Sequence, residues 1–147
     1  MFRTEEKERR IIAIKCQSFT IRENIESLIY QLGLTPVGVS SYSALMDQYH
    51  SCGKSLKAAI YKVELPTERI SLDSQLAAPQ KIFDSLKRIK AIPLIAVYLS
   101  PLNPDTTLED QLKSSGADAA ICYPLTPQTL YNTLRTLGFE KLVRPKQ

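Results

Sequence analysis

Short apolar segments alternate with amphipathic helical segments five times along this chain, and this alternation restricts the fold more than any other feature. Turn-forming residues bound the apolar segments, which is typical of strands that are covered on both faces of a sheet. Strands that alternate with helices indicate a parallel sheet with right-handed crossovers and helices on both faces. The predicted strands are 11–14, 37–39, 58–65, 92–99 and 119–122.

The starts of three helices can be predicted from capping residues. Thr20 and Glu23 have the spacing of a capping box, and so do Thr106 and Glu109, so each threonine is predicted to begin a helix. Thr126 is predicted to cap the last helix, because the proline that follows it is favoured at the first helical position.

Two further helices are less sharply bounded. Residues 41–49 predict a helix that buries Ala44, Leu45 and Tyr49, and a loop is expected at 50–54. An apolar face over 82–89 predicts another helix. The polar stretch 67–80 before it is interpreted as an extended loop with a partial turn.

The length of 147 residues fits one α/β domain with a proper core. Five βα units of this size suit the flavodoxin-like (βα)5 doubly wound parallel sheet, with strand order 2-1-3-4-5. The predicted organisation is a charged lead-in or linker at 1–10, the domain at 11–139 and a basic tail at 140–147.

Composition argues against several classes of function. The net charge of +4 comes from scattered lysines and arginines, which disfavours nucleic-acid binding. The three cysteines have no metal-type spacing and fit reduced thiols in the cytoplasm. The start of the chain lacks the apolar core of a signal peptide, and no apolar run has the length of a membrane span. We therefore expect a cytoplasmic domain without membrane contact.

The segment from Gly116 to Leu137 contains Gly-Ala-Asp, a short strand, Tyr-Pro-Leu and a closing helix. This order resembles the end of a response-regulator receiver domain. Pro66, Pro93 and Pro124 stand at matching landmarks, and the resemblance covers roughly residues 10 to 138.

The resemblance implies a site at the carboxyl ends of the strands. In that family two acidic residues after the first strand hold Mg²⁺, and an aspartate after the third strand accepts the phosphoryl group. A serine or threonine follows the fourth strand and a lysine the fifth. The metal and the lysine offset the charge that develops on the phosphoryl group.

All five positions depart from the family pattern in this chain. The acidic pair falls on Lys15 and Cys16, the phosphoacceptor on Lys62, the hydroxyl on Tyr98 and the lysine on Tyr123. Glu64 is the nearest carboxylate, two residues beyond Lys62, and is a conceivable substitute acceptor. The first strand would still offer Mg²⁺ no oxygen ligand. We therefore expect a degenerate receiver pocket with no catalytic residues, metal or cofactor.

The Tyr123–Pro127 run and the missing aspartates are similar to the degenerate receiver-like segment of hybrid sensor histidine kinases of the BarA/GacS type. That similarity implies a non-enzymatic pseudo-receiver that binds the kinase core or receiver domains of a two-component system. Two alternatives stay open. Lys15 and Lys62 could form a sensor site for a small anion or a nucleotide, or the chain could be an active stand-alone response regulator.

A protein-binding role predicts an interaction face on the fourth helix, fifth strand and fifth helix. Tyr98 is too bulky for the small inward step that a receiver hydroxyl makes, so this face is expected to stay in one state. Tyr131 is predicted to be its anchor, because tyrosine gives a large contact area at low entropy cost. The residues expected to be exposed there are Gln111, Lys113, Gln128, Tyr131, Asn132 and Arg135.

Overall fold

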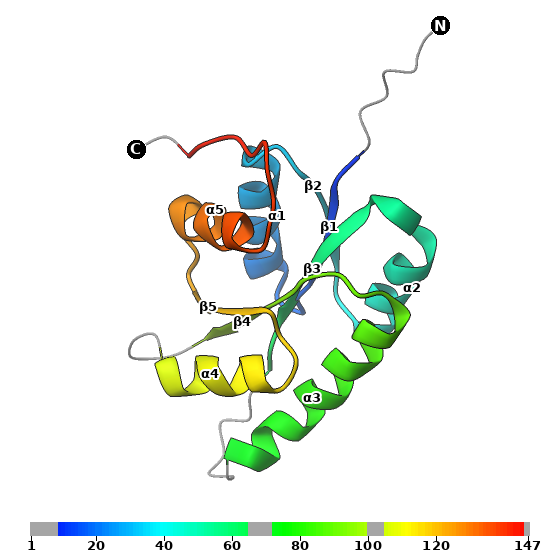
Figure 1. Cartoon of the computed structure of the whole chain (residues 1–147), viewed down its shortest axis with the longest axis vertical. Helices are drawn as coiled ribbons and strands as arrows, with labels where there is room; N and C mark the ends of the chain where they lie inside the picture. Colours follow the sequence, from blue (N-terminus) through cyan, green and yellow to red (C-terminus); the bar gives the residue numbers. More distant parts are fainter. Residues whose placement is uncertain (1–8, 65–71, 100–104, 146–147) are drawn as a thin grey trace, which may run out of the picture.

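The computed structural model describes residues 9–64, 72–99 and 105–145. Its centre is a parallel sheet with the strand order β2-β1-β3-β4-β5, which confirms the predicted flavodoxin-like order (Figure 1). The strands are β1 (Ile11–Lys15), β2 (Thr35–Val39), β3 (Leu56–Lys62), β4 (Leu94–Leu99) and β5 (Ala119–Tyr123).

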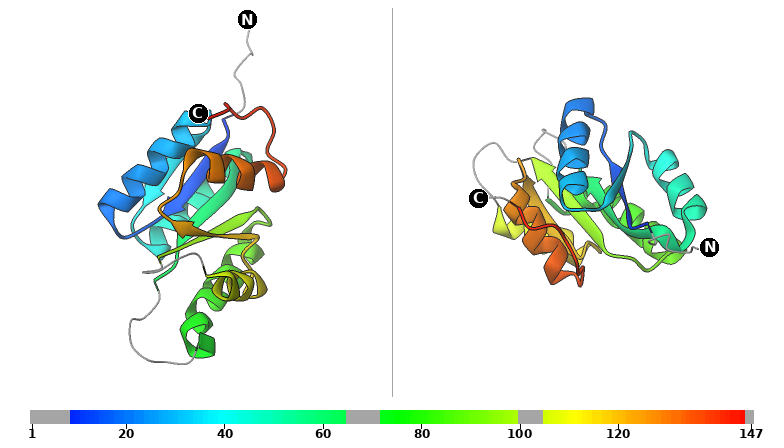
Figure 2. Two further views of the ribbon diagram at one scale, coloured as in Figure 1. Left: turned by 90° about the vertical axis from the view of Figure 1, so that its left-hand side faces the viewer. Right: turned by 90° about the horizontal axis from the view of Figure 1, so that it is seen from above.

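Helices cover both faces of the sheet. In Figures 1 and 2, α1 and α5 lie on one face, and α2, α3 and α4 lie on the other. No helix in the described part of the chain is long and apolar enough to cross a membrane. The helices are α1 (Phe19–Gln31), α2 (Tyr42–Ser51), the 3-10 turn η1 (Gly53–Ser55), α3 (Leu72–Ile89), α4 (Thr106–Ser114) and α5 (Pro127–Thr136).

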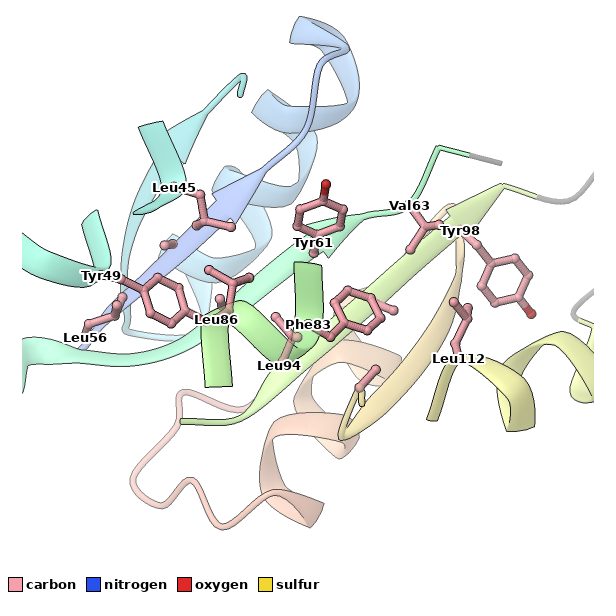
Figure 3. Packing of buried hydrophobic residues seen from close by; sticks show 14 of the residues in the cluster. Leu45, Tyr49, Leu56, Tyr61, Val63, Phe83, Leu86, Leu94, Tyr98 and Leu112 are labelled. Carbon is pink, nitrogen blue, oxygen red and sulfur yellow. The ribbon is translucent and has the colours of Figure 1, made fainter. Parts of the chain in front are cut away.

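Each face of the sheet has its own apolar core. Ile12 and Ile14 of β1 point to the side of α1 and α5, while the intervening Ala13 faces α2 and α3. In the core on the side of α2, α3 and α4, the rings of Tyr61 and Phe83 meet edge to face, with centroids 5.8 Å apart. Figure 3 shows how the side chains of α2, α3 and α4 meet those of β3 and β4 there.

Helix α3 begins earlier than the sequence predicted. Residues 72–80 belong to the helix, so the extended-loop interpretation of this part of 67–80 is wrong; residues 67–71 lie outside the described residues. Pro79 lies inside the helix, where proline removes one backbone hydrogen bond and normally marks a helix start. It is buried, and the helix continues through it to the core residues Phe83 and Leu86.

Both predicted capping boxes are wrong, whereas the cap at Thr126 is confirmed. Ser18 caps α1, because its hydroxyl accepts a hydrogen bond from the Ile21 amide at 3.3 Å. Asp105 caps α4 in the same way, through the Leu108 amide at 3.0 Å. Thr126 accepts from the Thr129 amide at 3.0 Å, as expected for a threonine before Pro127. In the two wrong cases a stronger capping residue stands one or two positions earlier.

Several smaller boundaries also differ from the prediction, and β2 begins at Thr35 instead of residue 37. Strand β3 spans Leu56–Lys62 rather than 58–65, and Leu65 lies outside the described residues. Strand β4 begins at Leu94 instead of residue 92. His50, expected in a loop, is an exposed residue in the last turn of α2.

The chain after α5 folds back onto the domain. The Arg10 guanidinium donates hydrogen bonds to the carbonyl oxygens of Glu140 and Lys141, at 2.5 and 3.1 Å. The Val143 amide donates to the carbonyl oxygen of Leu32, at the end of α1, at 2.9 Å. Phe139 and Leu142 pack on the core beneath α1 and α5, so residues 139–143 contribute contacts to the fold.

Candidate functional site at the strand ends

The register of the sheet brings the five degenerate receiver positions to one edge. Lys15 pairs with Tyr61, one residue before Lys62, and Lys62 pairs with Val97, one residue before Tyr98. Tyr98 in turn pairs with Cys122, one residue before Tyr123. The mapped residues therefore lie on neighbouring strands at their carboxyl ends, where doubly wound folds bind ligands.

Lys15 and Lys62 are both buried at this edge, with 5% and 6% of their surfaces exposed. The Lys62 ammonium lies 3.2 Å from both carboxylate oxygens of Glu64. The Lys15 ammonium lies 4.8 Å from the centroid of the Tyr61 ring, and no oxygen of the described residues accepts a hydrogen bond from it. Burial lowers the pKa of Lys15, and the Glu64 carboxylate offsets part of this effect.

Replacing Lys15 with methionine is expected to raise the free energy of unfolding at neutral pH. Partial desolvation disfavours the charged form of Lys15, and methionine fills similar space without a charge. Chemical denaturation of both proteins over a range of pH measures the difference. Because the folded-state pKa of Lys15 is lowered, the stabilisation should be complete below that pKa and vanish as the pH rises toward the ordinary lysine value. A difference that stays constant up to that pH would contradict the assignment.

Cys16 follows β1 and is fully buried. Its thiol contacts the carbonyl oxygen of Ser18 at 3.5 Å, and its own carbonyl accepts a hydrogen bond from the Arg22 guanidinium at 2.7 Å. These contacts tie the end of β1 to the start of α1. No general base lies within hydrogen-bond distance of the thiol in the described residues.

Tyr98 is fully buried at the end of β4, and its ring points toward α4 (Figure 3). Its hydroxyl donates a hydrogen bond to the Glu109 carboxylate at 2.5 Å and accepts one from the Asp105 amide at 2.8 Å. Burial, with the Glu109 hydrogen bond, raises the pKa of Tyr98 well above its ordinary value, so the phenol remains protonated. The two bonds hold the first turn of α4 against β4. Sequence reasoning assigned Glu109 to a capping box and missed this contact.

Tyr123 and Cys122 end β5 on opposite faces of the sheet. Tyr123 is half-buried and packs with the core on the α1 and α5 side. Cys122 packs with the core on the α2, α3 and α4 side. The peptide bond between Tyr123 and Pro124 is cis. An aromatic ring thus stands where the resemblance implies a lysine.

The site does not fit the Mg²⁺ ion of the receiver family. Within the described ranges, no three histidine, cysteine, aspartate or glutamate side chains gather to hold a metal ion. Glu64 is the carboxylate next to the strand-end lysines, and both of its oxygens are engaged by Lys62. An ammonium group at Lys15 repels a divalent cation.

The predicted interaction face needs two corrections. Tyr131 is buried rather than exposed, with 8% of its surface accessible, because it shares the inward side of α5 with Leu130 and Leu134. Its hydroxyl accepts a hydrogen bond from the Arg135 guanidinium at 3.1 Å. Gln111 is half-buried, and its side-chain oxygen has no partner in the described structure.

The other four predicted face residues, Lys113, Gln128, Asn132 and Arg135, are exposed. We call this set the α4–α5 surface. Lys113 and Asn132 line a cavity of about 260 Å³ between α4, β5 and α5, together with Thr133 and Thr136. The Gln128 and Asn132 side chains are joined by a hydrogen bond of 2.9 Å. Thr133 and Thr136 were not predicted, because polar residues on a helix carry no signal for a hollow beside it.

Comparison with known proteins gives matches of structure alone. No protein-family model and no curated protein matches this chain in sequence. A response regulator receiver domain protein from Clostridium thermocellum has a TM-score of 0.66 at 20% identity, covering 87% of this chain and 93% of that one. A CheY-like receiver domain protein from Methanospirillum hungatei JF-1 has a TM-score of 0.64 at 13% identity, covering 87% and 92%.

A two-component response regulator from Clostridium difficile gives the same picture, with a TM-score of 0.64 at 14% identity and coverage of 88% and 95%. Each match includes nearly the whole of both chains, so the likeness extends beyond the sheet to the surrounding helices. This chain has the fold of the response-regulator receiver domains.

Proposed function

We propose that this chain is a receiver-like domain that accepts no phosphoryl group and acts by binding protein partners in two-component signalling. One observation carries the proposal. Two buried lysines, Lys15 and Lys62, occupy the strand ends at which phosphoryl transfer would need carboxylates. The domain is proposed to have no enzymatic activity of its own and to work in the cytoplasm.

The electrostatics of the strand ends support the first half of this proposal. Phosphoryl transfer to a carboxylate needs a metal ion to offset the charge of the phosphoryl oxygens. The ammonium group of Lys15 opposes metal binding, and Glu64 is held in an ion pair with Lys62. The nucleophile is therefore occupied and the metal ligands are missing from the described part of the site.

The contacts of Tyr98 support the second half. A switching receiver needs a residue at this position that can move, whereas the buried Tyr98 ring is fixed to α4 by Glu109 and Asp105. The α4–α5 surface is thereby held in one arrangement, which suits constitutive docking. We propose that the partners are the kinase core and receiver domains of a hybrid sensor histidine kinase, following the sequence resemblance around Tyr123.

Incubation with acetyl phosphate and Mg²⁺ is expected to leave the mass of the protein unchanged. Intact-mass spectrometry of the protein, beside a phosphorylatable receiver domain as a positive control, makes the test. The reason is the missing acceptor and metal ligands at Lys15 and Lys62. A mass increase of one phosphoryl group that Glu64→Gln abolishes would overturn the proposal, because it would make Glu64 a working acceptor.

A further inference from the structure

The strand-end lysines form a cluster whose charges do not balance. Lys15 and Lys62 supply two ammonium groups, and Glu64 supplies one carboxylate. The thiol of Cys16 and the phenol of Tyr61 are the other titratable groups that face Lys15. The cluster therefore holds one surplus positive charge when both lysines are protonated.

The carboxylate of Glu64 is the member of this cluster that can leave. Its side chain is 47% exposed, whereas the Lys62 side chain is 8% exposed. Both carboxylate oxygens lie 3.2 Å from the same ammonium nitrogen, toward the long end of the hydrogen-bond range. Glu64 follows β3 without belonging to a strand, so its departure breaks no sheet pairing.

Lys15 provides the second reason to expect a ligand. Its ammonium group lies over the ring of Tyr61, and no oxygen of the described residues accepts a hydrogen bond from it. The ammonium group is partly desolvated and has no hydrogen-bond acceptor among the described residues, so an anion that reached both Lys15 and Lys62 would give each group a partner. Lys62 already shows the geometry in which a carboxylate is held here.

We propose that Lys15 and Lys62 bind a small oxyanion without a metal, and that Glu64 is an internal competitor that occupies Lys62 in its absence. The ligand class is a carboxylate or a tetrahedral oxyanion, since both present paired oxygens to ammonium groups. This site lies at the strand ends, apart from the α4–α5 surface, and is independent of the docking role proposed above.

Thermal unfolding in sodium sulfate, against sodium chloride at equal ionic strength, tests the proposal. Glu64→Gln frees Lys62 from its ion pair, so saturating sulfate should raise the Tm of this variant by about 3–5 °C and the Tm of the unaltered protein by less. Lys62→Met should lose the sulfate-specific rise, while Lys81→Met, which removes an exposed lysine on α3, should keep it. Equal rises in all four proteins would overturn the proposal.

A second measurement keeps the test independent of folding in the lysine variant. Sulfate titrated into Glu64→Gln should shift the NMR signals of the Lys15, Cys16 and Lys62 amides more than those of the α4–α5 surface. Acetate in place of sulfate separates planar carboxylates from tetrahedral oxyanions. Shifts spread over the whole surface would refute the site. Failure here would leave the acetyl phosphate result and partner binding unaffected, so the two proposals fail separately.

Discussion

Leu134→Ala is expected to lower the free energy of unfolding by about 2–5 kcal/mol. Leu134 is fully buried in the core between α5 and the sheet, beside Leu130 and Ile121. Truncation removes its apolar contacts and leaves a cavity that the sheet cannot fill, because β4 is paired on both sides and β5 is paired with β4 along its length. A typical domain has about 5–15 kcal/mol of stability, so the loss would be a large share of the total.

Urea denaturation followed by circular dichroism measures this change. Gln128→Ala in the first turn of the same helix is the matched control, because Gln128 is exposed and bonds to Asn132 alone among the described residues. The control should cost less than about 1 kcal/mol. A loss below about 1 kcal/mol for Leu134→Ala would mean that α5 does not close this core.

The sheet and the last helix could be predicted because their sequence signals agree. Ile121 lies in a continuous apolar segment, and Thr126 before a proline marks the helix start without a competitor nearby. The prediction of where α1 starts was wrong because Thr20 and Ser18 are both good capping residues, and spacing alone cannot choose between them. The prediction missed the first part of α3 because the stretch 67–80 is largely polar and was interpreted as a loop.

For the candidate site, the positions of the residues could be predicted but their contacts could not. The positions of Lys15 and Lys62 followed from strand order, since parallel strands end at one edge. The partners of the site residues did not follow, because they depend on side-chain directions. The bond from Tyr98 to Glu109 crosses from β4 to α4, and no sequence pattern records it. Tyr131 was misplaced because it borders the apolar stripe of α5, where a small rotation decides between core and surface.

Reversing the charge at Lys113 and Arg135 together is expected to weaken binding to the kinase core or receiver domain by about 100-fold or more. Both residues are exposed on the α4–α5 surface, and Lys113 lines the cavity there together with Asn132. Arginine is enriched among the residues that dominate binding energy, and a like charge placed across an interface costs several kcal/mol. The variant Lys113→Glu with Arg135→Glu tests this by isothermal titration with each purified partner domain.

The matched control reverses two other exposed lysines, with Lys54→Glu on η1 and Lys81→Glu on α3. It changes the net charge by the same amount at residues outside the α4–α5 surface, so it separates a local contact from general attraction. The control should bind within about threefold of the unaltered protein, since distant charges are screened at physiological salt. If both variants lost affinity equally, long-range charge would explain the binding. If neither did, and Lys15→Met with Lys62→Met bound weakly, docking would move from the α4–α5 surface to the strand ends.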